Sequence, residues 1–89
     1  MASTDPQLQS QPDQVGIGWL VNTTRQQVVH FKADRASGME AWVSIRTYHY
    51  DPPRPPEPLS QRRVLRQNAI ETWTVMLKSG WRPCRAPAR

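Results

Sequence analysis

The sequence has little cysteine and little glycine, and each shortage excludes a class of site. Its 89 residues include one cysteine and four glycines. A single cysteine, Cys84, cannot form an internal disulfide or a cysteine-clustered metal site. The glycines form no phosphate-cradling motif. No apolar run approaches the ~18 residues of a membrane span, and the N-terminus has no secretion signal, so we expect a cytoplasmic protein without membrane contact.

Acidic residues are also scarce. Seven of them face twelve Lys and Arg, which gives a net charge of +5. From Arg54 onward, eight cations stand against only Glu57 and Glu71. Ten of the twelve cations are Arg, which suits bidentate contact with phosphate or carboxylate. The pattern fits an anionic partner, and a high net charge also serves solubility.

The side chains that usually perform catalysis are poorly represented. His30 and His49 are the only histidines and have no companion at metal-ligand spacing. No base or orienting group is placed beside Cys84 by the sequence. We therefore predict no catalytic residues, no metal and no cofactor, and we expect that the protein is not an enzyme.

The chain divides into a short domain and two tails. Residues 1–15 are rich in Gln, Ser and Pro and predict a disordered N-terminal tail. Residues 16–83 predict one domain, and residues 84–89 a basic C-terminal tail.

Three apolar segments predict an antiparallel β-meander. They span residues 18–21, 27–32 and 40–48, with polar turns between them. The alternation in the second and third strands gives one apolar face, which should contact a helix. The opposite face would display Trp42, Tyr48, His30, Arg46 and Lys32.

Residues 51–58, DPPRPPEP, contain five prolines and predict a stiff, extended linker between the third strand and a helix. The PxxP spacing within this segment is also compatible with docking in an aromatic groove.

The segment 61–79 predicts an amphipathic helix. Ser60 is a good N-cap, and Leu59 and Val64 have the spacing of a hydrophobic staple. Gly80 suits the left-handed C′ position, and Trp81 can fold back as the Schellman contact. The apolar arc consists of Leu65, Ala69, Ile70, Trp73, Met76 and Leu77. The predicted fold class is therefore α+β, with a three-stranded antiparallel meander followed by one C-terminal helix packed on one face (βββα).

Three arginines lie at the predicted helix start. Arg62, Arg63 and Arg66 would occupy the first two turns, where the helix dipole disfavours cations by about 0.3–1 kcal/mol each. One interpretation is an anion site formed with the free amides of the helix end. The other is that their stems cover apolar surface and their charged ends reach carboxylates or solvent.

The outward sheet face is a second candidate site. Trp42, Arg46 and Tyr48 can stack on unpaired bases, or they can anchor a protein interface. A third interpretation is that the proline-rich linker covers these rings, which would make them structural. The other tryptophans are expected in the core, with Trp73 at its centre.

The motifs of the chain resemble a family. They are Gly18-Trp19-Leu20-Val21, then Val29-His30-Phe31, then Pro58-Leu59-Ser60-x-Arg62-Arg63-x-x-Arg66-x-x-Ala69-x-x-x-Trp73-x-x-Leu77-x-x-Gly80-Trp81. This pattern is similar to a small domain of unknown function from marine cyanobacteria of the Synechococcus and Prochlorococcus types. The resemblance covers Gly16 to Trp81; it implies a cyanobacterial cytosolic setting and no assigned activity. Members of that family tend to close with a further tryptophan, whereas this chain ends in 85–89, RAPAR.

Two functional hypotheses follow. The favoured one is a non-catalytic protein-interaction or accessory module, which includes self-association through the outer sheet face or an edge strand. The alternative is binding of nucleic acid or another polyanion through the Arg-rich helix start and the basic, aromatic sheet face. The partner itself is not identified by the sequence.

Overall fold

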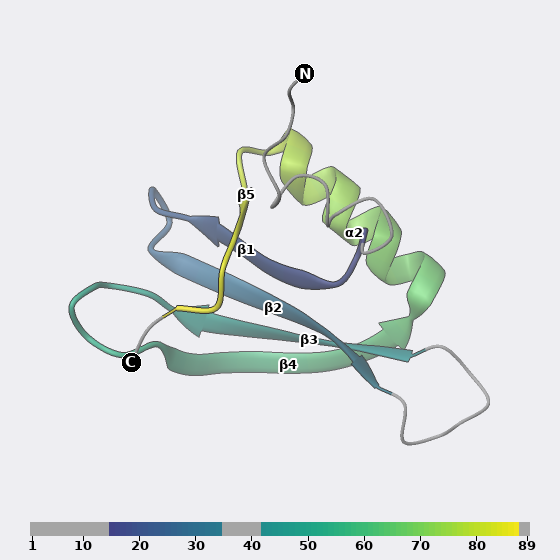
Figure 1. The fold of residues 1–89 in the computed structure, drawn as a ribbon, viewed down its shortest axis with the longest axis horizontal. Coiled ribbons are helices and arrows are strands. Elements are labelled where there is room, and N and C mark those ends of the chain that lie inside the picture. Colours follow the sequence, from purple (N-terminus) through teal and green to yellow (C-terminus); the bar gives the residue numbers. More distant parts are fainter. Residues whose placement is uncertain (1–14, 35–41, 88–89) are drawn as a thin grey trace.

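A computed structural model describes residues 15–34 and 42–87 as a sheet covered by one helix. The elements are β1 (Gly18–Asn22), β2 (Gln27–Asp34), β3 (Trp42–His49), β4 (Glu57–Leu65), α2 (Arg66–Lys78) and β5 (Arg82–Cys84). The strand order is β4-β3-β2-β1-β5, and every neighbouring pair is antiparallel. Figure 1 shows the helix on one side of the sheet. The predicted α+β class is confirmed, but the sheet has five strands rather than three.

The first three strands form the predicted meander. A tight turn joins β1 to β2, in which the backbone N–H of Arg25 donates to Oδ1 of Asn22 at 3.1 Å. Gln26 takes the left-handed conformation there, with φ of 57°, and its N–H donates to the carbonyl of Thr23. The predicted disordered tail lies outside the described residues except for Val15, as do the loop at 35–41 and the last two residues of the basic tail.

The proline-rich segment is a hairpin loop and not a crossover to the helix. Its first part is a turn in which the N–H of Arg54 donates to the carbonyl of Asp51 at 3.0 Å. The chain then returns along β3 as strand β4, from Glu57 to Leu65. The predicted linker at 51–58 therefore ends inside a strand (Figure 1).

The predicted helix start at residue 61 is wrong, because residues 57–65 belong to β4. Ser60 is paired opposite Thr47 and caps no helix, and Leu59, the predicted staple residue, is 55% exposed on the strand. The local signals for a helix were real, but pairing satisfies the backbone groups of β3, which would otherwise be left as an open edge. A non-local interaction has overridden local propensity.

Helix α2 begins at Arg66 and ends as predicted, by a Schellman motif. Its N-cap, Leu65, provides no side-chain hydrogen bond. At the other end, the N–H of Trp81 donates to the carbonyl of Met76 at 3.0 Å, and that of Gly80 to Leu77 at 3.3 Å. Gly80 has φ of 103°, which a residue without Cβ adopts without strain.

The core lies between the helix and one face of the sheet. It consists of Leu20, Val29, Phe31, Val43, Ile45, Ala69, Trp73 and Trp81. The rings of Phe31 and Trp73 meet edge to face, with centroids 5.1 Å apart. Of the predicted apolar arc, Ala69 and Trp73 are buried, but Leu65 and Leu77 are 36% and 40% exposed, so these two are not core residues. Leu65 lies on β4, where the helical period does not apply.

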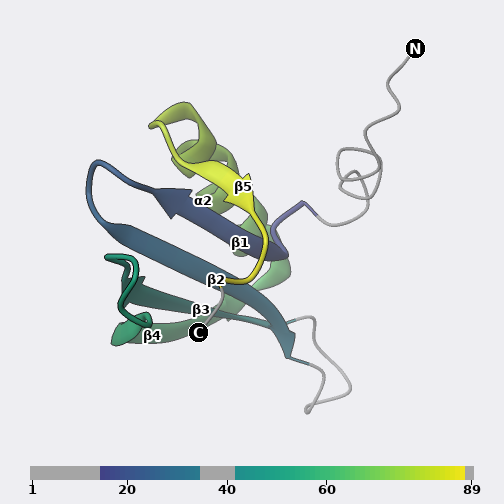
Figure 2. The ribbon, with the colours of Figure 1, turned by 60° about the vertical axis from the view of Figure 1, so that its left-hand side comes forward.

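Strand β5 was not predicted. Its three residues follow the buried Trp81 and pair with β1, with Pro83 opposite Leu20. Figures 1 and 2 show the chain turning after β5 and crossing β2, and in Figure 2 the helix lies behind the sheet. Within residues 15–34 and 42–87, no helix has the length and apolar composition that crossing a membrane requires.

Candidate functional site

The face of the sheet opposite the helix, which we call the outer face, is defined by strand register. Directly opposed residues of an antiparallel sheet point to the same side. Arg46 is opposite His30 and Gln61, and its neighbour Ile45 is in the core, so Arg46 points outward. The predicted set of Trp42, Tyr48, His30, Arg46 and Lys32 shares this face by register.

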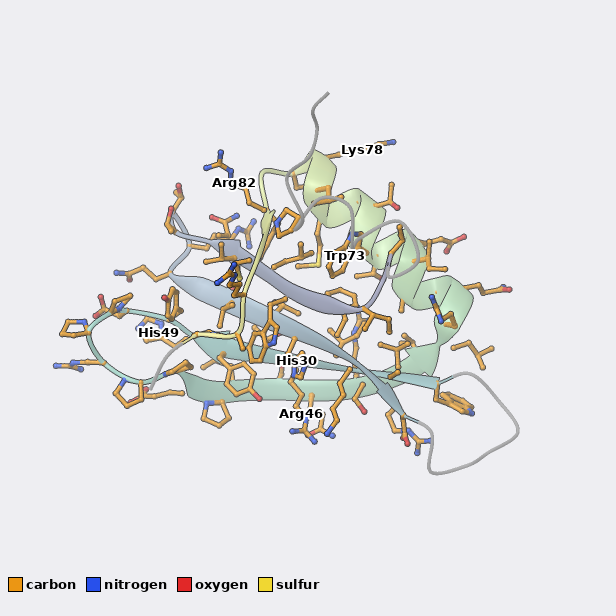
Figure 3. All side chains as sticks on the ribbon, viewed as in Figure 1. His30, Arg46, His49, Trp73, Lys78 and Arg82 are labelled. Atoms are coloured by element: carbon orange, nitrogen blue, oxygen red, sulfur yellow. The ribbon has the colours of Figure 1, made fainter. Side chains whose placement is uncertain are left out.

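A row of planar groups crosses the outer face. The indole of Trp19 stacks on the imidazole of His30, with ring centroids 4.1 Å apart and an angle of 4° between the planes. Tyr48 lies beside Trp19 at 5.9 Å, tilted by 30°. Arg46 is the cross-strand neighbour of His30 on the other side (Figure 3). The row therefore joins two aromatic rings, an imidazole and a guanidinium on three adjacent strands.

Trp19 is the residue of this row that sequence reasoning missed, since it was expected in the core. Leu20 is completely buried against the helix, so its neighbour Trp19 must point outward. The alternation in β1 would have indicated this. Val28 also lies on the outer face, opposite Tyr48 and Val21, and is nevertheless fully buried.

The environment of His30 favours its neutral form. Partial burial lowers the pKa of His30 below its ordinary value of 6.5, and the positive charges of Lys32 and Arg46 lower it further. At neutral pH the ring against Trp19 is therefore uncharged, and the positive charge in the row belongs to Arg46.

Trp42 lies at one end of the outer face, beneath Arg63. The guanidinium carbon of Arg63 is 5.1 Å from the centre of the Trp42 ring, which is cation–π geometry. Nε of Arg63 also lies 3.1 Å from Oδ2 of Asp34, in an ion pair. Trp42 is half-buried and contacts Arg63 from β4, so its outward orientation agrees with the prediction from parity.

The predicted cluster of three arginines is divided by the strand. Arg63 is opposite Ser44 on the outer face, whereas Arg62 is opposite Ile45 and points to the helix side. Arg66 is the first residue of α2. The prediction that all three occupy the first two turns of a helix is wrong, because β4 places successive side chains on opposite faces.

Positive charge dominates the outer face. By register it carries Lys32, Arg46, Arg63 and Arg82. Among the described strand residues, Asp34 is the one carboxylate on this face, and it is paired with Arg63. Nε of Arg46 is buried and has no hydrogen-bond partner among the described residues. A buried donor without a partner is unfavourable for the folded protein.

Two shallow depressions meet at the centre of this face. One is lined by Lys32, Ala33, Asp34, Ser44, Arg46, Gln61 and Arg63. The other is lined by Arg46, Thr47, Tyr48, Pro58, Leu59, Ser60 and Gln61. Arg46 and Gln61 line both, so the two depressions adjoin across this pair.

Groups for metal or nucleophilic chemistry are not assembled here. In the part of the chain that the structure describes, no three His, Cys, Asp or Glu side chains converge as ligands for a metal ion. Burial raises the pKa of the Cys84 thiol, which keeps it protonated at neutral pH. Cys84 lies opposite Trp19 at the β5 edge of the outer face.

Comparison with known proteins assigns a family without an activity. A family model described as a protein of unknown function, DUF1651, matches residues 17–88. No curated protein and no solved structure matches the sequence. The match agrees with the resemblance to a domain of unknown function, and the cyanobacterial origin stays a prediction.

Proposed function

The chain belongs to the DUF1651 family, whose function is unknown, and we propose that it is a non-catalytic binding module that holds an anionic partner on its outer face. One observation carries this proposal. Among the described strand residues, four cations share the outer face with one carboxylate, and that carboxylate is already paired. Such a face attracts anions over a distance comparable with the Debye length, about 8–10 Å at physiological salt.

The position of Arg46 strengthens the case. It lies in the middle of the face, between His30 on β2 and Gln61 on β4, and it lines both depressions. A guanidinium presents several donors in a fixed plane, which matches the oxygens of phosphate or carboxylate. An anion on this face would gain a charge-assisted hydrogen bond from the guanidinium.

Self-association through a sheet edge is the less favoured form of the interaction hypothesis. Edge strand β4 contains Pro58, and the register shifts at Leu59, which has no opposite residue on β3. Edge strand β5 has three residues and contains Pro83. Prolines, register irregularities and short length are features that discourage edge pairing.

The test uses heparin, a polyanion without bases, and two double variants that remove equal charge. Lys32→Gln with Arg46→Gln removes two cations from the outer face. Arg62→Gln with Lys78→Gln removes one cation from the helix side and one from the end of the helix (Figure 3). We expect the first pair to weaken heparin binding by about tenfold or more at low salt, and the second by about twofold.

The contrast between the two double variants is the decisive readout, because both have the same net charge. An equal loss of heparin affinity in the two double variants would mean that binding depends only on total charge and that the outer face has no special role. Absence of any heparin binding at low ionic strength would also overturn the proposal. Circular dichroism of both variants is the control that checks whether they retain the fold.

A further inference from the structure

The two depressions on the outer face form one groove with chemically different halves. Arg46 and Gln61 lie at the junction and line both halves. Toward one end of β3 the groove is lined by Tyr48, Pro58 and Leu59. Toward the other end it is lined by Lys32, Ser44, Arg63 and the carboxylate of Asp34, which is paired with Arg63. The first half is ring-bearing and apolar, and the second is cationic.

The apolar half is available for contact. Leu59 is 55% exposed because it lies at the register shift of β4, where it has no cross-strand partner. Pro58 and Tyr48 are directly opposite each other on β4 and β3. A phenol ring, a pyrrolidine ring and an exposed aliphatic side chain together provide a surface for a flat aromatic group, because stacking needs only a π-face.

The junction between the halves is polar. Gln61 provides both amide donors and an amide acceptor, which can pair with the edge of a base. Arg46 contributes its guanidinium, and it lines both halves. The cationic half then continues through Lys32 and Arg63, which are the cross-strand neighbours of Ser44 on either side. This order of apolar, hydrogen-bonding and cationic groups corresponds to the base, its polar edge and the phosphate of a nucleotide.

We infer that this groove binds an unpaired nucleotide of single-stranded nucleic acid, with the base against Tyr48 and the phosphate between Lys32 and Arg46. The inference rests on the proposed function and names its partner class. In a duplex the bases are stacked and paired, so they cannot enter a groove beside Tyr48. An acidic peptide would use the cationic half and leave the Tyr48 half empty. Of these three partners, the single strand is the one that uses both halves.

The experiment measures fluorescence anisotropy of labelled oligothymidylate and oligouridylate of about 12 nucleotides, within the usual range for a single-strand site. Unlabelled duplex of similar length, heparin and polyglutamate are the competitors. We expect the single strands to bind in preference to the duplex, with affinity that falls steeply as salt increases. Polyglutamate should compete poorly.

Two substitutions separate base recognition from charge. Tyr48→Ala should weaken single-strand binding by about tenfold and leave heparin binding within about twofold, since stacking contributes only when bases are present. Tyr48→Phe is the matched control and should retain single-strand affinity. Leu59→Ser removes apolar surface at an exposed position, so it tests the same half of the groove even if Tyr48→Ala does not fold.

The outcomes distinguish this inference from the proposed function. If heparin binds through Lys32 and Arg46 but single strands bind no better than duplex, the nucleotide inference is overturned and the anion-binding face stands. Preference for polyglutamate would assign the face to an acidic protein partner and would also overturn the inference. If no polyanion binds, the nucleotide inference and the proposed function are both wrong.

Discussion

The indole of Trp19 lies flat against the imidazole of His30, with centroids 4.1 Å apart, on the face of the sheet that the helix does not cover. The two residues are opposite each other on β1 and β2, where antiparallel pairing brings their Cβ atoms within about 4.5–5.5 Å. This contact couples the protonation of His30 to the packing of the outer face. Protonation would introduce charge beside Lys32 and Arg46, which already lower the pKa of His30.

We first predict that stability decreases in mild acid because of His30. The pKa of His30 is lower in the folded protein than its ordinary value of 6.5, so below that pH the unfolded state binds more protons. The contribution of neutral His30 to stability is fully present above pH 6.5. It is lost as the pH falls from there through the pKa of His30 in the folded protein. Thermal unfolding between about pH 7.5 and about pH 5 should show a decrease in Tm that His30→Gln reduces. An unchanged slope in His30→Gln would contradict this account.

Second, adjacent arginines on β4 should contribute unequally. Arg63 contacts both the Trp42 ring and Asp34, although its side chain is 49% exposed. Solvent screening limits the two contacts together to about 0.5–1 kcal/mol. We expect Arg63→Gln to lower the free energy of unfolding by that amount and Arg62→Gln to have little effect. Urea titrations of both variants give the comparison, and equal losses would count against the assigned register.

Third, the glycine at the helix end should be required because of its left-handed backbone conformation and not because a larger side chain lacks room. Gly80 has φ of 103°, and no atom lies within 4 Å of a Cβ added there. Gly80→Ala should cost about 1 kcal/mol through backbone strain alone, and Gly80→Asn less. By contrast, a Cβ at Gly16 would lie 3.0 Å from Cγ1 of Ile70, so Gly16→Ala should be more destabilising. The order of the three unfolding midpoints is the test.

Fourth, two members of the predicted apolar arc should differ strongly in their importance. Trp73 is 5% exposed and contacts Phe31 edge to face, so Trp73→Ala should cost about 3–5 kcal/mol, most of the stability of a small domain. Leu77 is 40% exposed, and Leu77→Ala should cost less than about 1 kcal/mol. Similar losses would indicate that the helix packs through the arc expected from sequence.

Much of the architecture followed from local pattern. The alternation of β2 and β3 correctly separated the core residues Phe31 and Ile45 from the outward residues His30 and Arg46. The glycine at position 80 and the tryptophan after it correctly predicted the Schellman end of the helix. These signals are readable because period, handedness and capping depend on residues a few positions apart.

The candidate site was predictable only in part. Trp42, Arg46 and Tyr48 were placed on one face by parity, and the structure adds Trp19 to them through its stacking on His30. The contact of Trp42 with Arg63 joins β3 to β4, and no local pattern indicates it. This contact depends on β4, a segment for which the sequence predicts a helix.

By itself, the sequence determined the class of fold, the face on which β2 and β3 bury their apolar residues, and the end of the helix at Gly80. The tertiary structure alone decided that residues 57–65 are a strand, because the hairpin at 51–56 returns the chain to the open edge of β3, where backbone pairing outweighs the cap and staple signals around Ser60. It thereby decided that Arg62 and Arg63 point to opposite faces. It also brought residues 82–84 beside β1, because that pairing depends on where the buried Trp81 directs the chain.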